Sequence, residues 1–404
     1  MQSGRLSAGG RGAHHVCASA QAAPAWRSYI LGQWHTRSSR RGLQHTSALR
    51  GAESGTAAPG PWDPELDRVH SSHYCSTSDQ DGNTQRELQR WQAYTAYLAE
   101  LQAPAGSVPL LRCTTLVAQA LRHPARQHSW VEAAMDRLAR KVARQLPAAP
   151  APRYPLKVLR TLLDVLYNQQ GFRGQLPAMV PSDESSLIDQ VLTHRGGTRL
   201  TLSLLVMEVA RRLDLSLKLV QLPGCLLLAL DLEGVEVLVD AFRGELLVPA
   251  EVADRVEGAT GKPWRPQPGF IQQAGWVDPR RFLWLWLDEL KQSYLDSHQM
   301  SQALCVVRLM RATLADQAGD LRDEGICLYA LTRFAEAASA LAAYLKVTPL
   351  APDALLVWQL LEGCPSLQQQ RHQVVQAAEE EDEQEQRVST TEDDINSQDA
   401  EEGR

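Results

Sequence analysis

Residues 196–230 decide the fold, and they read GGTRLTLSLLVMEVARRLDLSLKLVQLPGCLLLAL. After the two glycines, Thr198–Leu213 is apolar on most of its sides, which predicts a buried helix. The period then changes, because Leu215, Leu217 and Leu219 alternate with polar residues, as in a β-strand. The stretch therefore predicts one buried helix that leads into a sheet.

The sheet is expected to be small and antiparallel. Pro223-Gly224 breaks the first strand, and Cys225–Leu230 forms the second. Glu233-Gly234 then turns the chain, and Val235–Val239 returns as a third strand. Such short turns join antiparallel strands, because parallel strands need long crossover connections.

Apolar residues at three- and four-residue spacing predict helices over most of the remaining chain. The expected helices before the sheet cover about 84–101, 108–121, 130–146, 156–167 and 185–192. Those after a stretch rich in proline and glycine (261–279) cover about 282–295, 300–314 and 352–361. The fold class is therefore α+β and mostly helical.

One segment between the last helices has the spacing of a tetratricopeptide-like unit. Gly325, Ala337 and Pro349 stand twelve residues apart, with apolar residues between them. In such a unit a small residue lets two helices approach closely, and the proline ends the second helix. Because one unit cannot bury its faces alone, we expect it to pack against the flanking helices and cap the domain.

Composition fits an ordinary globular protein and excludes several functions. The chain has 404 residues, 44% of them hydrophobic, and a formal net charge of −6. No apolar run reaches the roughly 18 residues of a membrane-spanning helix. The seven cysteines contain no Cys-x-x-Cys pair, so neither a zinc site nor a disulfide framework is predicted, and no cofactor is expected. The middle of the chain is nearly neutral, which argues against nucleic acid as a partner.

The two ends differ in charge from the middle. Residues 1–52 contain seven arginines and no acidic residue, and residues 1–55 read as an organellar transit peptide for chloroplast or mitochondrion. A disordered extension is the other reading of these residues. Residues 56–83 read as a linker, and the acidic stretch 369–404 as a disordered tail. The tail either solvates the chain or binds a basic partner.

Several motifs together resemble the SirB family of transglutaminase-like proteins, over about residues 84–361. The resemblance implies a papain-like core at 84–260 and tetratricopeptide-like helical hairpins at 280–365. The motifs are Gly171–Gly174, Ser185–Leu192, Arg195, Gly197, Leu200–Leu205, Glu208–Leu213, Pro223-Gly224, Asp240–Gly244, Arg322–Gly325 and Ala351–Asp353.

The residues of a catalytic triad are mostly missing at the matching positions. Transglutaminase-like enzymes place a cysteine at the start of the buried helix, where the helix dipole lowers the thiol pKa. The SirB family commonly has proline there, and this chain has Arg199. The family's Pro-Gly-His is Pro223-Gly224-Cys225 here, and its asparagine before Ser186 is Ser185. Asp240 alone matches its slot, so the resemblance does not imply an established reaction.

Each candidate residue has a functional and a structural interpretation. In the functional interpretation Cys225 is a nucleophile assisted by Asp240, and in the structural interpretation it is a small core residue. Thr201 and Ser203 are nucleophiles, or hydroxyls that bond the helix backbone. His194 is a displaced base, or a solvated or capping residue. For each of these we favour the structural reading.

Arg199 and three aromatic residues also carry two interpretations. Arg199 binds an anion or pairs with Asp240 across the former cleft, or is a surface arginine. Phe282, Trp284 and Trp286 form a helix-packing core or a nucleotide-stacking platform, and we favour the core.

We therefore expect a noncatalytic scaffold that binds protein or peptide partners, with Arg199, Thr201 and Asp240 as the predicted binding residues. Relatives of the module fused to an F-box hint at an adaptor in organellar protein turnover, although no F-box pattern is visible here. The competing hypothesis is a hydrolase or acyltransferase that uses Cys225 or Thr201 with Asp240. The oligomeric state is left open.

Overall fold

The computed structural model describes residues 80–104, 106–122, 126–147, 154–175, 185–230 and 237–364. The transit peptide, most of the linker, the turn at Glu233-Gly234 and the acidic tail of the sequence-based prediction lie outside these residues. The described chain forms two compact units, each made of separate stretches. The first unit contains residues 138–173 and 206–277, and the second contains the remaining described residues.

The first unit is built on a four-stranded antiparallel sheet, and its strands follow the chain in the order β3-β4-β5-β6. They are β3 (Leu217–Leu222), β4 (Cys225–Leu230), β5 (Leu238–Asp240) and β6 (Glu245–Leu247). The prediction of β4 is confirmed to the residue. The alternation that predicts the first strand begins two residues early, and no sequence pattern predicts β6.

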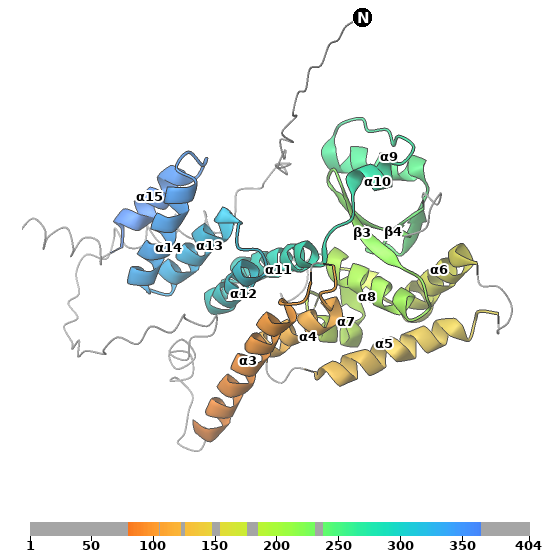
Figure 1. Cartoon of the computed structure of the whole chain (residues 1–404), viewed down its shortest axis with the longest axis horizontal. Helices are drawn as coiled ribbons and strands as arrows, with labels where there is room; N and C mark the ends of the chain where they lie inside the picture. Colours follow the sequence, from red (N-terminus) through yellow and green to blue (C-terminus); the bar gives the residue numbers. More distant parts are fainter. Residues whose placement is uncertain are drawn as a thin grey trace, which may run out of the picture. The chain divides into compact units, whose positions relative to one another are not determined.

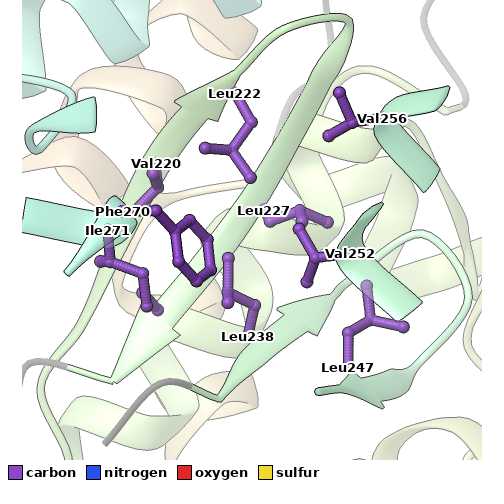
Figure 2. Close-up of a cluster of buried hydrophobic side chains, with 10 residues drawn as sticks. Val220, Leu222, Leu227, Leu238, Leu247, Val252, Val256, Phe270 and Ile271 are labelled. Carbon is purple, nitrogen blue, oxygen red and sulfur yellow. The ribbon is translucent and has the colours of Figure 1, made fainter. Parts of the chain in front are cut away.

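One face of this sheet carries the core of the unit (Figure 2). Leucine and valine side chains from all four strands meet residues of two helices, α9 (Pro249–Thr260) and α10 (Phe270–Ala274). The buried members are Val220, Leu222, Leu227, Ala229, Leu238, Leu247, Val252, Val256, Phe270 and Ile271. Burial of these side chains is what holds the sheet and the two helices together.

Two helices in this unit do not follow from the sequence pattern. Residues 249–260 form α9, with Pro249 in its first turn, and the side chain of Glu251 accepts a hydrogen bond from the backbone N–H of Val248. α10 lies inside the stretch rich in proline and glycine, where no helix is expected. Before the sheet, α6 (Pro155–Leu163) continues into a π-helical turn, η1 (Asp164–Gln169). The expected helix over 156–167 thus changes its winding in its second half.

The second unit begins with helices close to the expected bounds. They are α3 (Gln80–Glu100), which starts inside the predicted linker, α4 (Leu110–Leu121) and α7 (Ile188–His194). The two glycines of the opening motif form β2 (Gly196–Gly197), which pairs with β1 (Arg173–Gly174) in a two-stranded sheet. α5 (His128–Ala143) and the central helix α8 (Arg199–Arg211) each contribute residues to both units.

Five helices complete the second unit, and each contacts the next one along the chain (Figure 1). They are α11 (Pro279–Asp296), α12 (Met300–Thr313), α13 (Ala318–Ala330), α14 (Phe334–Val347) and α15 (Ala354–Glu362). The pair α13 and α14 confirms the predicted helical unit, and α14 ends two residues before Pro349.

Gly325 lets α13 and α14 approach closely, as its spacing predicts. A Cβ atom built on Gly325 would lie 2.6 Å from the Leu341 side chain on α14. Ala337 is fully buried at the same pair of helices. The small residues are therefore a packing requirement of this helical unit.

The Arg322–Gly325 motif also supplies a buried ionic network. Arg322 Nη1 lies 2.6 Å from Asp353 Oδ2, and Asp323 accepts from Lys291 Nζ at 2.7 Å. Burial alone would lower the pKa of Lys291, but the charges of Asp323 and Asp288 raise it above its ordinary value. These pairs link α11, α13 and the start of α15.

Within the described ranges, no helix combines the length and apolar character needed to cross a membrane. The same part of the chain holds no group of three or more His, Cys, Asp or Glu residues arranged to bind a metal ion.

Candidate functional site

The start of α8, where a transglutaminase-like enzyme would carry its cysteine, is a tightly bonded polar cluster in the second unit. Arg199 is the first residue of the helix and its side chain is exposed. Thr198 Oγ1 accepts a hydrogen bond from the Thr201 N–H at 3.3 Å, which caps the helix. The Thr201 hydroxyl is buried and donates to the Ser185 carbonyl at 3.0 Å.

Ser185 and Ser186 hold this helix start in place through their backbone carbonyls. Ser185 O also accepts from the Thr198 N–H at 2.9 Å, and Ser186 O accepts from Trp286 Nε1 at 2.9 Å. Trp286 and Phe282 are buried, and Trp284 Nε1 donates to Asp320, so the helix-packing reading of these aromatic residues is confirmed. The serine positions of the SirB-like motif therefore support α8.

Glu289 of α11 belongs to the same cluster, and sequence reasoning misses it. Burial raises the pKa of its carboxyl to about 7, against the opposing effects of a hydrogen bond with Thr198 and the charge of Arg199. Its Oε2 atom is buried without a hydrogen-bond partner among the described residues. The available signal is an acidic residue three positions after Trp286 and directly before Leu290, on the apolar side of the helix.

Asp240 has a structural role in the first unit. It ends β5, and its Oδ1 accepts from the backbone N–H groups of Phe242 at 3.0 Å and Arg243 at 3.3 Å. Its Oδ2 pairs with Arg255 Nη1 at 2.9 Å. Both carboxylate oxygens are thus used to fix the turn and to hold α9. Sequence reasoning could not find this pair, because Arg255 lies on an unexpected helix.

Tyr167 closes this turn from the π-helical segment. Its hydroxyl donates to the Ala241 carbonyl, and its ring lies where any Cβ at Gly244 would have to go, 2.3 Å from the nearest ring atom. Burial, with the nearby charge of Asp240, raises the pKa of Tyr167 above its ordinary value. The Asp240–Gly244 motif is therefore a turn built around a tyrosine ring.

Cys225 lies beside this corner, and its thiol bonds a backbone carbonyl. The thiol is half-buried at the start of β4, packs against the core of the sheet, and donates to the Arg255 carbonyl at 3.5 Å. Cys225 and Asp240 are thus brought to the same arginine, through its backbone and its side chain respectively. This geometry fits the core interpretation of Cys225.

The remaining predicted residues take backbone or surface positions. Ser203 donates to the Arg199 carbonyl at 2.8 Å, which confirms its backbone-bonding interpretation. His194 is the exposed last residue of α7. Arg199 and Asp240 belong to different units, so their pairing stays a prediction.

Comparison with known proteins gives this geometry a context. Residues 129–283 match the transglutaminase-like superfamily, and residues 290–362 match the tetratricopeptide repeat. No solved structure is significantly similar to the chain.

Curated bacterial proteins are similar over part of the chain. Protein SirB1 of Salmonella typhimurium is 29% identical over 42% of this chain and 61% of its own length. The UPF0162 protein of Vibrio cholerae is 27% identical over 40% of this chain and 59% of its own length. The UPF0162 protein YchA of Escherichia coli K12 is 28% identical, with coverage of 42% and 61%. The chain thus spans about three fifths of the curated relatives that it matches.

The order of the two matched regions, the small antiparallel sheet and these homologues agree with the resemblance read from the motifs. The chain is a homologue of SirB1 that carries a transglutaminase-like domain followed by tetratricopeptide-repeat helices.

Proposed function

We propose that this chain is a noncatalytic scaffold that binds protein or peptide partners. The observation that carries the proposal is that both carboxylate oxygens of Asp240 already have hydrogen-bond partners. A carboxylate that orients a catalytic histidine must direct an oxygen at the imidazole. Here one oxygen is bound to two backbone N–H groups and the other to Arg255, at 2.9 Å.

The start of α8 supports the same proposal. A nucleophilic hydroxyl needs a neighbouring base and access for a substrate. The Thr201 side chain is 1% exposed, and its hydroxyl bonds the Ser185 carbonyl and approaches the Thr198 hydroxyl at 3.1 Å. Arg199, which occupies the cysteine slot, supplies only hydrogen-bond donors and neither a thiol nor a hydroxyl that could act as a nucleophile.

The last helices of the repeat region offer a surface for a partner. Val347, Leu350, Leu355 and Trp358 are large apolar residues that stay exposed around the end of α14 and on α15. We call these four residues the α15 surface. Leu355 is 73% exposed and Trp358 49% exposed, and they stand three residues apart on one helix. Exposed apolar groups that gather in this way mark interaction sites.

Photo-crosslinking of the full chain tests the binding function. A photoreactive phenylalanine analogue at position 350, which is 95% exposed, should capture a specific protein, and the double variant L355E/W358E should abolish the capture. Leu88 and Trp91 are a matched control, because they are also exposed and three residues apart, on α3. The L88E/W91E variant should keep the crosslink. Capture that survives L355E/W358E, or no specific capture at all, would refute the proposal.

A role as an adaptor in organellar protein turnover is the finer form of this proposal. It draws on the F-box analogy and on the acid-free N-terminal segment, which lies outside the described residues. A fusion of residues 1–55 to a fluorescent protein should enter chloroplasts or mitochondria. A fusion that stays outside both organelles would remove the organellar part.

The hydrolase or acyltransferase alternative is tested with a thiol-directed activity probe on the intact chain. Stoichiometric labelling at neutral pH that disappears in C225S would overturn the noncatalytic proposal. A chain without such labelling behaves as the arrangement of Cys225 and Arg255 leads us to expect.

A further inference from the structure

The outer edge of β3 is only partly covered. Pro223-Gly224 joins β3 to β4 in a two-residue hairpin, with Leu222 opposite Cys225. The closing pair of such a hairpin is hydrogen-bonded, so the backbone groups of every second residue from Leu222 point toward β4. The backbone N–H and C=O groups of Leu217 and Leu219 therefore point away from β4.

The segment after α10 covers this edge at one end. The Val277 N–H donates to the Leu219 carbonyl at 2.9 Å, and Val220 forms an isolated bridge with Trp276. Within the described part of the chain, the outward N–H and C=O of Leu217 have no backbone partner. An edge strand with unpaired backbone groups is a template for another strand.

A groove of about 420 Å³ lies beside this free end of the edge. One side is the last part of α8, and the other is the turn that leads into β3. Its lining residues are Met207, Glu208, Arg211, Asp214, Leu215, Ser216 and Leu217. A groove between a helix and an edge strand accepts an extended peptide, whose side chains enter the groove while its backbone pairs with the strand.

The charges in the groove favour a basic residue in that peptide. Glu208 is already paired with Arg212, at 2.7 Å, and with Arg211, at 3.1 Å. Asp214 is exposed and has no ion-pair partner among the described residues. It also stands just past the C-terminus of α8, where the helix dipole adds negative potential.

We propose that an extended segment of a partner protein adds to the edge of β3 at Leu217, places an apolar side chain in the groove beside Met207 and Leu215, and pairs a neighbouring lysine or arginine with Asp214. The inference rests on the proposed binding function and names the chemistry of the partner.

Selection of a phage-displayed random peptide library on the full chain tests this inference. Enriched peptides should combine an apolar residue with an adjacent Lys or Arg. A synthetic copy of the leading peptide should lose affinity about tenfold or more for the D214K variant. N-methylation of one of its backbone amides should cause a similar loss, because strand addition depends on main-chain hydrogen bonds.

Two variants control for nonspecific effects. Asp254 is an exposed aspartate on α9 in the same unit, so D254K makes the same charge change away from the groove and should leave the affinity within about twofold. D214N removes the charge with little change of shape and should weaken binding in the same direction as D214K. Circular dichroism melting curves identify any variant that fails to fold.

The outcomes separate this inference from the proposed function. Peptides that bind D214K as well as the unmodified chain, but not L355E/W358E, would overturn the groove and leave the scaffold proposal standing. Peptides that tolerate N-methylation at every position would overturn strand addition. If no peptide is enriched and no protein is captured at the α15 surface, both proposals fail.

Discussion

Asp240 and Arg255 form an ion pair between the end of β5 and α9, with 2.9 Å between Oδ2 and Nη1. The same aspartate fixes the turn to β6 through its other oxygen. A residue that matches a catalytic slot by sequence thus stabilises a corner of the sheet. Its loss should affect the free energy of unfolding.

The D240A variant should be destabilised by about 2 kcal/mol, because it removes charge-assisted hydrogen bonds and leaves Arg255 partly buried without this partner. Urea unfolding monitored by circular dichroism measures the change. D254A, at an exposed position on α9, should change stability by less than about 0.5 kcal/mol. Equal effects of the two substitutions would contradict a structural role for the corner.

Substitution at Gly325 tests the packing of the repeat helices. G325A should cost about 1–3 kcal/mol, because the added Cβ would lie 2.6 Å from Leu341 and force α13 and α14 apart. Gly319 is the matched control in the same helix, since a Cβ there meets nothing within 4 Å. G319A should be neutral or stabilising, by up to about 1 kcal/mol. The melting temperatures of the two variants should therefore move apart.

Glu289 should make stability depend on pH. Its pKa is about 7 in the folded chain, against an ordinary value of 4.5, so folding retains a proton that the unfolded chain releases. Stability should therefore fall as the pH rises from about 4.5 to about 7, by about 3 kcal/mol, and then stay level. Below that range both states are protonated and the residue contributes no pH dependence.

The E289Q variant should lose this part of the pH dependence, which urea midpoints between about pH 4.5 and pH 8 would reveal. Asp320 acts in the same direction, because burial raises its pKa to about 6, so the comparison with E289Q isolates Glu289. E257Q, at an exposed glutamate of α9, provides a control. A variant E289Q that keeps the full slope of the unmodified chain would show that Glu289 is not the titrating group.

Replacing Asp214, in the turn after α8, with glycine should raise the stability of the fold. Asp214 has a φ of 60°, and the Leu215 N–H bonds the Ala210 carbonyl at 3.0 Å, as in a helix end with a left-handed residue. D214G should raise stability by about 0.5–1 kcal/mol. The same change in the middle of α9, D254G, should lower it by about 1 kcal/mol. If thermal melts show that D214G and D254G change the stability in the same direction, this explanation is excluded.

The buried thiols should resist alkylation in the folded chain. Burial raises the pKa of Cys113 and of Cys305 to about 12, so neither carries much thiolate near neutral pH. Site-resolved mass spectrometry after iodoacetamide treatment should find both unmodified until denaturant is added. Rapid native labelling of either residue would show that its helix opens.

Sequence patterns predict the elements whose apolar period is clear. The leucine-rich segment at 225–230 forms β4 without change, and the spacing of Gly325 and Ala337 predicts a close helix pair. The strand β6 has only three residues, which is too short for a periodic signal. α9 mixes small, acidic and apolar residues, so the pattern of Pro249–Thr260 does not stand out.

The site residues are predictable only in part. The Ser203 hydroxyl bonds the backbone of its own helix, which is a local property of its position, whereas the Thr201 hydroxyl reaches the Ser185 carbonyl before the helix. Arg255 and Glu289 act through contacts distant in sequence, with Asp240 and Thr198 respectively. A single sequence contains no measure of such contacts, so the partners of a predicted residue remain unknown until the fold is known.

The contact between Tyr167 and Gly244 limits which mutations can compensate one another. Gly244 has a φ of 74°, so a larger residue there meets both the tyrosine ring and an unfavourable backbone conformation. A smaller residue at position 167 would remove the clash with the ring but not the unfavourable backbone conformation. A genetic screen for revertants of a Gly244 variant should therefore recover true reversions, or asparagine at 244 combined with a smaller residue at 167, and seldom a single change at Tyr167.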